Sequence, residues 1–273
     1  MDKTSFEGST SEFIRVQNGE VLKYPRQIWK ESRLYDTLTR DIETSFSVEC
    51  QILEHLGHHP RIVKYLGRNQ GEGDPRGILL AEASHGDLQR YLDQNEAVEA
   101  VAYIHHRGVV HADLRPENFL IHETTLMSLD LWLCDFGGSK CDELGVYGGH
   151  LPDSGFFDPT LEPSATTQMD IFSIGSVLYA ILTGHWPFRG LGVFKSPEEM
   201  NDYGNKVDNL FLQGTFPDVD ELFAGDIIMK CWKNEYASAE NVLQSLQAEM
   251  DRAERTRFWL AEWFDWVRSM LSP

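Results

Sequence analysis

Two short segments near the middle of the chain concentrate the side chains that can do chemistry. They read His-Ala-Asp-Leu-Arg-Pro-Glu-Asn over residues 111–118 and Asp-Phe-Gly over residues 135–137. The Asp113 carboxylate can accept the proton of a hydroxyl group, and Arg115 can place positive charge beside a phosphoryl group. Asn118 and Asp135 offer hard oxygen ligands of the kind that Mg²⁺ prefers. These residue types favour phosphoryl transfer.

The two segments, in this order, resemble the catalytic loop and the metal-binding Asp-Phe-Gly turn of the eukaryotic-type protein kinase family. Each segment is bounded by strand-like apolar residues. Two such segments in the family's order argue against coincidence. The resemblance implies that Asp113 is the catalytic base and that Arg115, in the place of a lysine, neutralises charge. It implies that Asn118 and Asp135 hold Mg²⁺.

A lysine and a glutamate upstream complete the catalytic set that the resemblance implies. Residues 13–24 read as two strands joined by a tight turn at Asn18-Gly19, and Lys23 lies in the second strand. Glu49 lies in a helix predicted over residues 45–56, and in this family it would pair with Lys23 and hold it against the phosphates. Taken alone, a strand lysine is more often an exposed edge residue, and Glu49 is one solvated charge among several.

The remaining nucleotide contacts follow from the resemblance only. The residues that it implies in ATP binding are Gly8, Lys23, Glu82, Ser84, Asp87, Asn118 and Asp135. Backbone groups of Glu82 and Ser84 would bind the adenine edge behind a small gatekeeper, Ala81, with Asp87 near the ribose. Gly8 is the only glycine in the segment that corresponds to the Gly-rich loop, and little chain precedes it to form a first strand. This degenerate loop weakens the expectation of tight nucleotide binding.

Three departures from the family pattern bear on activity. Residues 89–110 must hold what are normally two helices, and they are too few for both at about 20 residues each. Ala112 replaces the arginine that binds a phosphorylated activation segment, so activation is not expected to use that switch. Asp158-Pro159-Thr160 replaces Ala-Pro-Glu, and residues 236–240 lack the arginine partner. Because losing both partners of a buried pair can be nearly neutral, we expect a compensated structural change here.

The amino-acid composition limits which partners the protein can bind and in which cellular compartment we expect it. With 43 acidic and 24 basic residues the net charge is −19, which argues against binding nucleic acid or anionic lipid. Four cysteines without a CxxC pair predict neither a disulfide framework nor a zinc site. The N-terminus has no apolar region of a secretory signal, and the longest apolar stretch, residues 171–182, is too short to span a bilayer. We expect an intracellular protein, cytoplasmic or nuclear, with no transmembrane segment.

The C-terminal residues 258–271 form an aromatic helix pattern with a narrow polar stripe at Glu262, Asp265 and Ser269. Such a helix requires burial. The favoured interpretation is docking on its own large lobe. A groove on a partner protein comes second and a membrane surface third, since Lys and Arg are sparse.

These patterns predict an α+β, bilobal protein-kinase-like fold: a small antiparallel β-sheet lobe with one helix, and a larger, mainly α-helical lobe. The expected parts of this single domain are the small lobe with the start of the hinge (residues 1–82), the large lobe (83–250) and the aromatic helical extension (251–273). Within the family, the resemblance is to the kinase-like proteins common in filamentous fungi, over about residues 6 to 250.

The function that follows is an ATP- and Mg²⁺-dependent protein kinase that phosphorylates a hydroxyl of a protein substrate, with Ser/Thr favoured. The alternative is a pseudokinase, a nucleotide-binding or scaffolding module with weak or no turnover. A small-molecule phosphotransferase ranks lower, because Asp170–Gly175 and Lys230-Cys231-Trp232 resemble elements specific to protein kinases.

Overall fold

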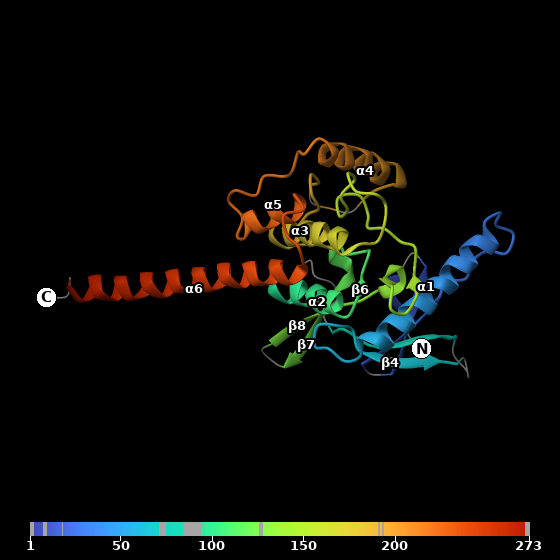
Figure 1. Ribbon diagram of the computed structural model, residues 1–273. Helices are drawn as coiled ribbons and strands as arrows, with labels where there is room; N and C mark the ends of the chain where they lie inside the picture. Colours follow the sequence, from blue (N-terminus) through green and yellow to red (C-terminus); the bar gives the residue numbers. More distant parts are fainter. Residues whose placement is uncertain are drawn as a thin grey trace.

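The chain forms two lobes, one built on an antiparallel sheet and the other mostly helical (Figure 1). The computed structural model describes residues 3–7, 10–17, 19–70, 75–84, 94–125, 128–190, 192 and 194–270. The sheet lobe uses one helix and the other lobe holds the remaining ones, so the predicted α+β bilobal architecture is confirmed.

The small lobe is a five-stranded antiparallel sheet with the order β1-β2-β3-β5-β4. Its strands are β1 (Lys3–Glu7), β2 (Ser11–Gln17), β3 (Glu20–Pro25), β4 (Tyr65–Asn69) and β5 (Gly77–Ala81). The predicted hairpin is the β2–β3 pair, and its turn uses the positive φ of 78° at Gly19, which glycine adopts without strain. A first strand also forms, although the sequence argued that too little chain was available. Five residues suffice, because β1 needs to pair with only one neighbour, β2.

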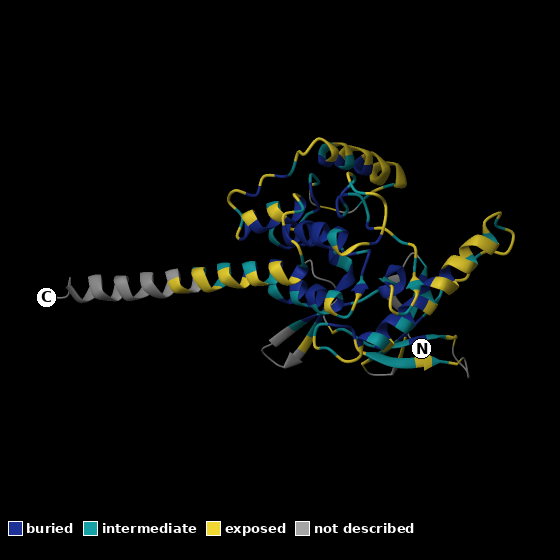
Figure 2. Ribbon diagram, in the orientation of Figure 1, coloured by how far each residue is buried: buried dark blue, intermediate teal, exposed yellow. Residues whose placement is uncertain are grey.

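One helix, α1 (Tyr35–Leu56), packs on this sheet. Its second half buries Val48, Ile52 and Leu56, as the apolar pattern predicts. The helix begins ten residues before the predicted start at residue 45, because its first turns are polar and largely exposed and therefore carry no apolar period (Figure 2).

The large lobe is organised around a buried central helix. Its helices are α2 (Gln94–His106), α3 (Thr167–Thr183), α4 (Pro197–Leu212), α5 (Gly225–Trp232) and α6 (Ala239–Met270). Nearly all of α3 is buried (Figure 2), so the predicted core helix is confirmed. The Thr166 side chain caps it by accepting a hydrogen bond from the Met169 N–H at 3.2 Å, and it ends at Gly184 with φ 75°.

Short strands and turns between the lobes place the two chemical segments. They are β6 (Val109–Val110), η2 (Pro116–Asn118), β7 (Phe119–Thr125), β8 (Ser128–Leu133), η3 (Phe136–Gly138), β9 (Lys140–Cys141) and β10 (Val146–Tyr147). Strands β7 and β8 form an antiparallel hairpin, and β6, β9 and β10 form a second small sheet. The first segment therefore runs from β6 to β7, and the second begins directly after β8.

The region that the sequence marked as shortened contains the 13-residue helix α2, and residues 85–93 before it lie outside the described part. Despite its length, α2 is well packed: Val98, Val101 and Ile104 are fully buried. The helix α6 packs along α2, and Val242 and Leu246 near the beginning of α6 are buried. The aromatic side chains from residue 258 onward are outside the described side chains. Among the described residues, no helix is both long and apolar enough to cross a membrane.

Candidate active site

The backbone of residues 111–118 is held by Asp170 at the start of α3. The fully buried Asp170 carboxylate accepts hydrogen bonds from the His111 N–H at 2.8 Å and the Ala112 N–H at 3.0 Å. Its Oδ2 also lies 2.9 Å from His105 Nε2. Ala112 has φ 65°, a left-handed conformation that costs a non-glycine residue about 1–2 kcal/mol. Asp170 stabilises this bend, a role that the sequence did not suggest.

His111 is a buried, neutral support beneath the loop. Burial lowers the pKa of His111, and its hydrogen bonds match one neutral tautomer. Nε2 donates to the Cys134 carbonyl at 3.0 Å, while Nδ1 accepts from the Asp113 N–H at 3.3 Å. Its ring meets Phe136 edge-on, with centroids 5.0 Å apart, and α1, which carries the buried Leu53, packs against η3. His111 and Phe136 thus connect the catalytic loop to the Asp-Phe-Gly turn.

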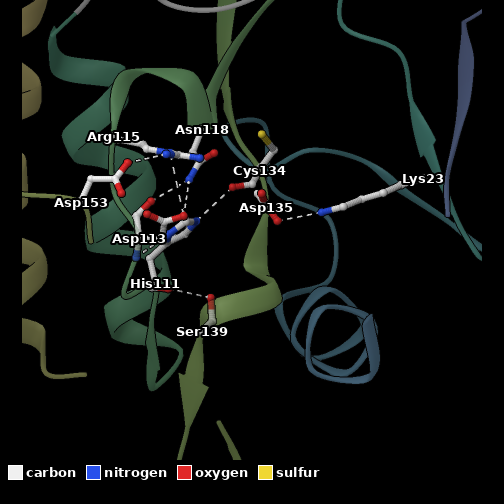
Figure 3. Close-up of polar contacts among 9 residues, drawn as sticks. All are labelled: Lys23, His111, Asp113, Arg115, Asn118, Cys134, Asp135, Ser139 and Asp153. Carbon is white, nitrogen blue, oxygen red and sulfur yellow. Dashed lines mark hydrogen bonds and ion pairs between the residues drawn. The ribbon is translucent and has the colours of Figure 1, made fainter. Parts of the chain in front are cut away.

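Asp113 and Asn118 face each other across this loop. Asn118 Nδ2 donates to the Asp113 carbonyl at 2.7 Å and to its Oδ2 at 3.3 Å (Figure 3). This orientation leaves the amide oxygen of Asn118, the atom that can bind a metal, outside both hydrogen bonds. Burial raises the pKa of Asp113 to about 7; Arg115 opposes this shift, and Asp135 and Asp153 add to it. A carboxylate that titrates near neutral pH is suited to accept a proton.

Lys23 makes two ion pairs, one within the small lobe and one to the large lobe. Its Nζ lies 2.8 Å from Glu49 Oε2 and 2.7 Å from Asp135 Oδ1. The Lys23–Glu49 pair expected from the resemblance is present, and it is buried, with side-chain exposures of 4% and 1%. Strand β3 lies inside the sheet, so Lys23 is not an edge residue. Burial alone would lower the pKa of Lys23, but Asp135 and Glu49 outweigh it and raise that pKa.

Asp135 supplies an ionised carboxylate at the start of the Asp-Phe-Gly turn. Burial opposes its ionisation, but the Lys23 ammonium prevails and lowers the pKa of Asp135 to about 2. The side chain remains 44% exposed, and the backbone adopts a left-handed φ of 62°. Its carboxylate and the Asn118 amide oxygen fit a Mg²⁺ ion that takes its other ligands from phosphates and water. The described residues contain no cluster of three or more His, Cys, Asp or Glu that could hold a metal ion.

Arg115 contacts a carboxylate that the sequence analysis did not single out. Its Nη1 donates to Asp153 Oδ2 at 2.6 Å, whereas its Nε lies 4.0 Å from Asp113 Oδ2 (Figure 3). Asp153 follows Arg115 by 38 residues in an irregular stretch, so no local pattern could have indicated the contact.

Only some of the residues predicted to bind the nucleotide lie in the described part of the chain. Gly8 and Asp87 lie outside the described residues. The Glu82 N–H donates to the Gly19 carbonyl at 2.8 Å, so of its two backbone groups the carbonyl is the one left for an adenine contact. Its side chain is ion-paired with Arg15 on β2. The Ser84 hydroxyl accepts a hydrogen bond from the Glu123 N–H at 2.7 Å.

A cavity of about 450 Å³ lies between α4 and the stretch that contains Asp153. Its lining includes Asp153, Ser154, Trp186, Met200, Tyr203 and Asp208. The lining contains no lysine or arginine, and burial raises the pKa of Asp208. The cavity therefore combines apolar walls with carboxylates.

The small lobe holds a five-stranded sheet and the large lobe is helical. The site between them contains Lys23, Glu49, Asp113, Asn118 and Asp135. This combination defines a protein kinase. The profile of the protein kinase domain matches residues 27–209, more than half of the chain. The chain belongs to the protein kinase family.

Several curated kinases are similar to it. Calcium/calmodulin-dependent protein kinase type 1 of Macrobrachium nipponense is 26% identical over 194 residues, covering 66% of this chain and 55% of that protein. Ribosomal protein S6 kinase alpha-2 of Homo sapiens is 30% identical over 173 residues, covering 56% and 23%. Fatty acyl-CoA synthetase and RNA processing-associated kinase 1 of Saccharomyces cerevisiae is 28% identical over 192 residues, covering 63% and 22%. The matched region thus spans about half of the first relative and less than a quarter of the other two.

Proposed function

We propose that this chain is a protein kinase that transfers the ATP γ-phosphate to a serine or threonine hydroxyl of a protein. The observation that carries the proposal is the position of Lys23, whose Nζ lies within 2.8 Å of both Glu49 and Asp135. These contacts hold a cation from the small lobe beside the metal-binding carboxylate of the large lobe. Such an arrangement suits the binding of nucleotide phosphates between the lobes.

In this proposal each polar side chain has a separate task. Asp113 accepts the proton of the substrate hydroxyl, and its pKa of about 7 leaves it largely ionised slightly above neutral pH. Lys23 orients the phosphates, and Arg115 neutralises charge on the transferred group. Asn118 and Asp135 would hold Mg²⁺, which supplies charge neutralisation at the phosphates. In this proposal the cavity lined by Asp153 and Asp208 would bind a segment of the protein substrate.

The preference for serine or threonine rests on the loop sequence and on the relatives. Arg115-Pro116-Glu117 is closer to the Ser/Thr pattern, although the arginine departs from it. One relative, 25% identical over 201 residues, is named serine/threonine-protein kinase dkf-2 of Caenorhabditis briggsae. Phosphoamino-acid analysis of a mixed peptide library tests the preference directly.

The test of activity uses radiolabelled ATP, Mg²⁺ and that library, with Asp113→Asn as the control. We expect label on serine or threonine with the wild-type chain and none with the variant. Equal labelling by both proteins would contradict the role of Asp113.

A pseudokinase is the second candidate, and the single glycine in the Gly-rich segment favours it. Thermal unfolding with and without ATP and Mg²⁺ separates nucleotide binding from turnover. Nucleotide at 100 times its Kd would add about 2.7 kcal/mol to the free energy of unfolding. Stabilisation without label transfer would favour the pseudokinase, and the absence of both would point to a scaffold that binds no nucleotide.

A further inference from the structure

Arg115 connects the catalytic loop to the activation segment, the residues that run from Asp135 to Thr160. Its Nη1 is 2.6 Å from Asp153 Oδ2, a charge-assisted hydrogen bond, and its Nε is 4.0 Å from Asp113 Oδ2. The longer distance exceeds hydrogen-bond range. Asp153 therefore provides the short contact that orients the guanidinium group (Figure 3).

If Arg115 did not pair with Asp153, it could pair with Asp113, the candidate base. Arg115 and Asp153 are each 29% exposed, and Asp113 is 18% exposed, so all three charges are shielded in part from water. Without the Asp153 carboxylate, the guanidinium would be attracted to Asp113, which is already within 4.0 Å. A direct Arg115–Asp113 hydrogen bond would occupy the base. Asp153 holds Arg115 near Asp113 without allowing that contact.

Asp153 is itself fixed by elements outside the catalytic loop. The next residue, Ser154, donates from its hydroxyl to Asp208 Oδ2 on α4 at 3.0 Å. Gly155, with φ 93°, packs so closely on Tyr203 that a Cβ there would lie 2.5 Å from the tyrosine hydroxyl. Helices α3 and α4 thus anchor this stretch, because the Ser173 hydroxyl of α3 also donates to the Phe156 carbonyl. The Asp153 carboxylate is therefore held in a fixed position from which it can orient Arg115.

We propose that Asp153 is a positioning residue that holds Arg115 for phosphoryl transfer and ties the activation segment to the catalytic loop by a permanent charge pair. The proposal rests on the kinase activity proposed above. In kinases whose activation segment is ordered by phosphorylation, the anion that pairs with arginine is a phosphate. In this chain Ala112 offers no guanidinium group, and Asp153 supplies a fixed anion to Arg115 instead.

A double-mutant cycle tests whether Asp153 acts through Arg115. With peptide substrate at saturating ATP, we expect Asp153→Asn to lower kcat about 10- to 100-fold, with less than about threefold change in the KM for ATP. In an Arg115→Gln background, the same substitution should cause no further loss. Losses that multiply in the double variant would show that Asp153 acts independently of Arg115 and would overturn the proposal.

Asp142→Asn is the matched control, because it makes the same chemical change in the same segment. Asp142 is 86% exposed, and its one ion pair within the described part of the chain is a surface contact of 3.2 Å with Lys140. We expect its kcat and KM to equal those of the wild type. An equal loss in this variant would mean that any neutralised carboxylate in the segment has the effect, which would also overturn the proposal.

A spectroscopic measurement reads the geometry without turnover. The Nε–H signal of Arg115 in ¹⁵N NMR can be assigned by its disappearance in Arg115→Lys. We expect this signal to shift and to exchange faster with solvent in Asp153→Asn, and to stay unchanged in Asp142→Asn. An unchanged signal in Asp153→Asn would refute the positioning role. If the wild type transfers no phosphate, the kinase proposal fails, and the NMR comparison alone decides whether Asp153 holds Arg115.

The permanent nature of the charge pair has its own test. Phosphatase treatment of the purified wild-type chain should leave its turnover unchanged within about twofold. Loss of activity after this treatment, with recovery on rephosphorylation, would show that a phosphate is required and would contradict a fixed carboxylate as the ordering anion.

Discussion

The Asp158 carboxylate accepts a hydrogen bond of 2.5 Å from the Asn234 side-chain amide, two residues before Thr160, which stands in the place of the family's glutamate. Asp158 is 4% exposed, and its other oxygen accepts from the Thr160 N–H at 2.9 Å and hydroxyl at 2.7 Å. A buried carboxylate, in the place of the family's alanine, is thus paired with a neutral amide. This contact ties the end of the activation segment to the loop between α5 and α6.

Replacing Asn234 with glycine should destabilise the large lobe. Glycine keeps the positive φ of 55° without strain but removes the amide, so one oxygen of Asp158 loses its partner. An unsatisfied buried acceptor costs about 1–3 kcal/mol. Gln168→Ala is the control, because it removes only the 2.9 Å contact to Asn234 Oδ1 and should cost less. Urea unfolding measures both variants, and equal midpoints for Asn234→Gly and the wild type would show that the contact adds nothing.

Lys23→Met should be more destabilising than Glu49→Gln. The first variant leaves a buried carboxylate unpaired, at a cost of about 3–5 kcal/mol, whereas the second leaves Lys23 paired with Asp135. Burial raises the pKa of Glu49, and removing Lys23, which opposes that rise, raises it further. A carboxyl group whose pKa is raised in the folded state makes the protein less stable as pH rises through that pKa. The loss of unfolding free energy caused by Lys23→Met should therefore be smaller at acidic pH. Unfolding at pH 5 and pH 8 checks this, and a deficit independent of pH would contradict it.

Asp113→Asn should abolish phosphotransfer and also stabilise the fold. The folded-state pKa of Asp113 is raised from 3.8 to about 7. Between these values the unfolded chain releases a proton that the folded chain keeps, so the group's contribution to stability falls as pH rises through this range. An asparagine avoids that loss. At pH 8 we expect a rise in Tm of about 2–4 °C, the equivalent of about 1 kcal/mol. The gain should vanish near pH 4, and a gain that persists there would exclude titration of Asp113 as its cause.

The sequence predicted those parts of the site that depend on residue type and local spacing. Lys23 and Glu49 could be paired because one lies in a strand and the other near the apolar face of a helix, within a resemblance that places them together. Their contact of 2.8 Å agrees with that prediction. The polar first half of α1 could not be predicted in this way, because an exposed helix has no apolar period.

The contacts that the sequence did not predict join residues far apart in the chain. Asp170 supports the backbone of His111 from 59 residues away, and Asp153 reaches Arg115 from 38 residues away. The contact of Asn234 with Asp158 was not predicted either, because it joins residues 76 positions apart. Such pairings require the packing of α3, α4 and the α5–α6 loop, which no local pattern encodes.

The shortened region before the catalytic loop should limit turnover, because a shorter helix supports the loop through fewer buried contacts. Glu96 near the start of α2 accepts from the Leu131 N–H at 2.7 Å and pairs with Arg61 at 2.8 Å. Extra residues between Asn95 and Glu96 would break this connection to β8. An added amphipathic segment that tests whether length limits the rate must therefore precede Gln94. We expect higher stability and rate from such an insertion, and no change in either would count against the role of helix length.

Asp135→Asn should weaken nucleotide binding in a Mg²⁺-dependent manner. The substitution removes a carboxylate whose pKa of about 2 keeps it ionised throughout the physiological range. Thermal shift with ATP should show a large effect of Mg²⁺ in the wild type and a small one in the variant. Asp142→Asn, on the exposed part of the same segment, provides the control. Equal ATP binding with and without Mg²⁺ in every protein would argue against a metal site at Asp135.

The aromatic extension can be tested apart from catalysis. The buried contacts of Val242 and Leu246 with the large lobe lie before residue 255, so deleting residues 255–273 should leave the lobe folded. An exposed patch of three tryptophans would be unusual in a monomeric protein, so we expect Trp259, Trp263 and Trp266 to be packed. In that case the deletion lowers Tm or promotes aggregation. Replacing the three tryptophans with glutamine keeps the helix length and should have the same effect on Tm. Calorimetry and light scattering measure both variants. A truncated chain as stable and monodisperse as the full chain would instead favour a groove on a partner protein as the binding site of this helix.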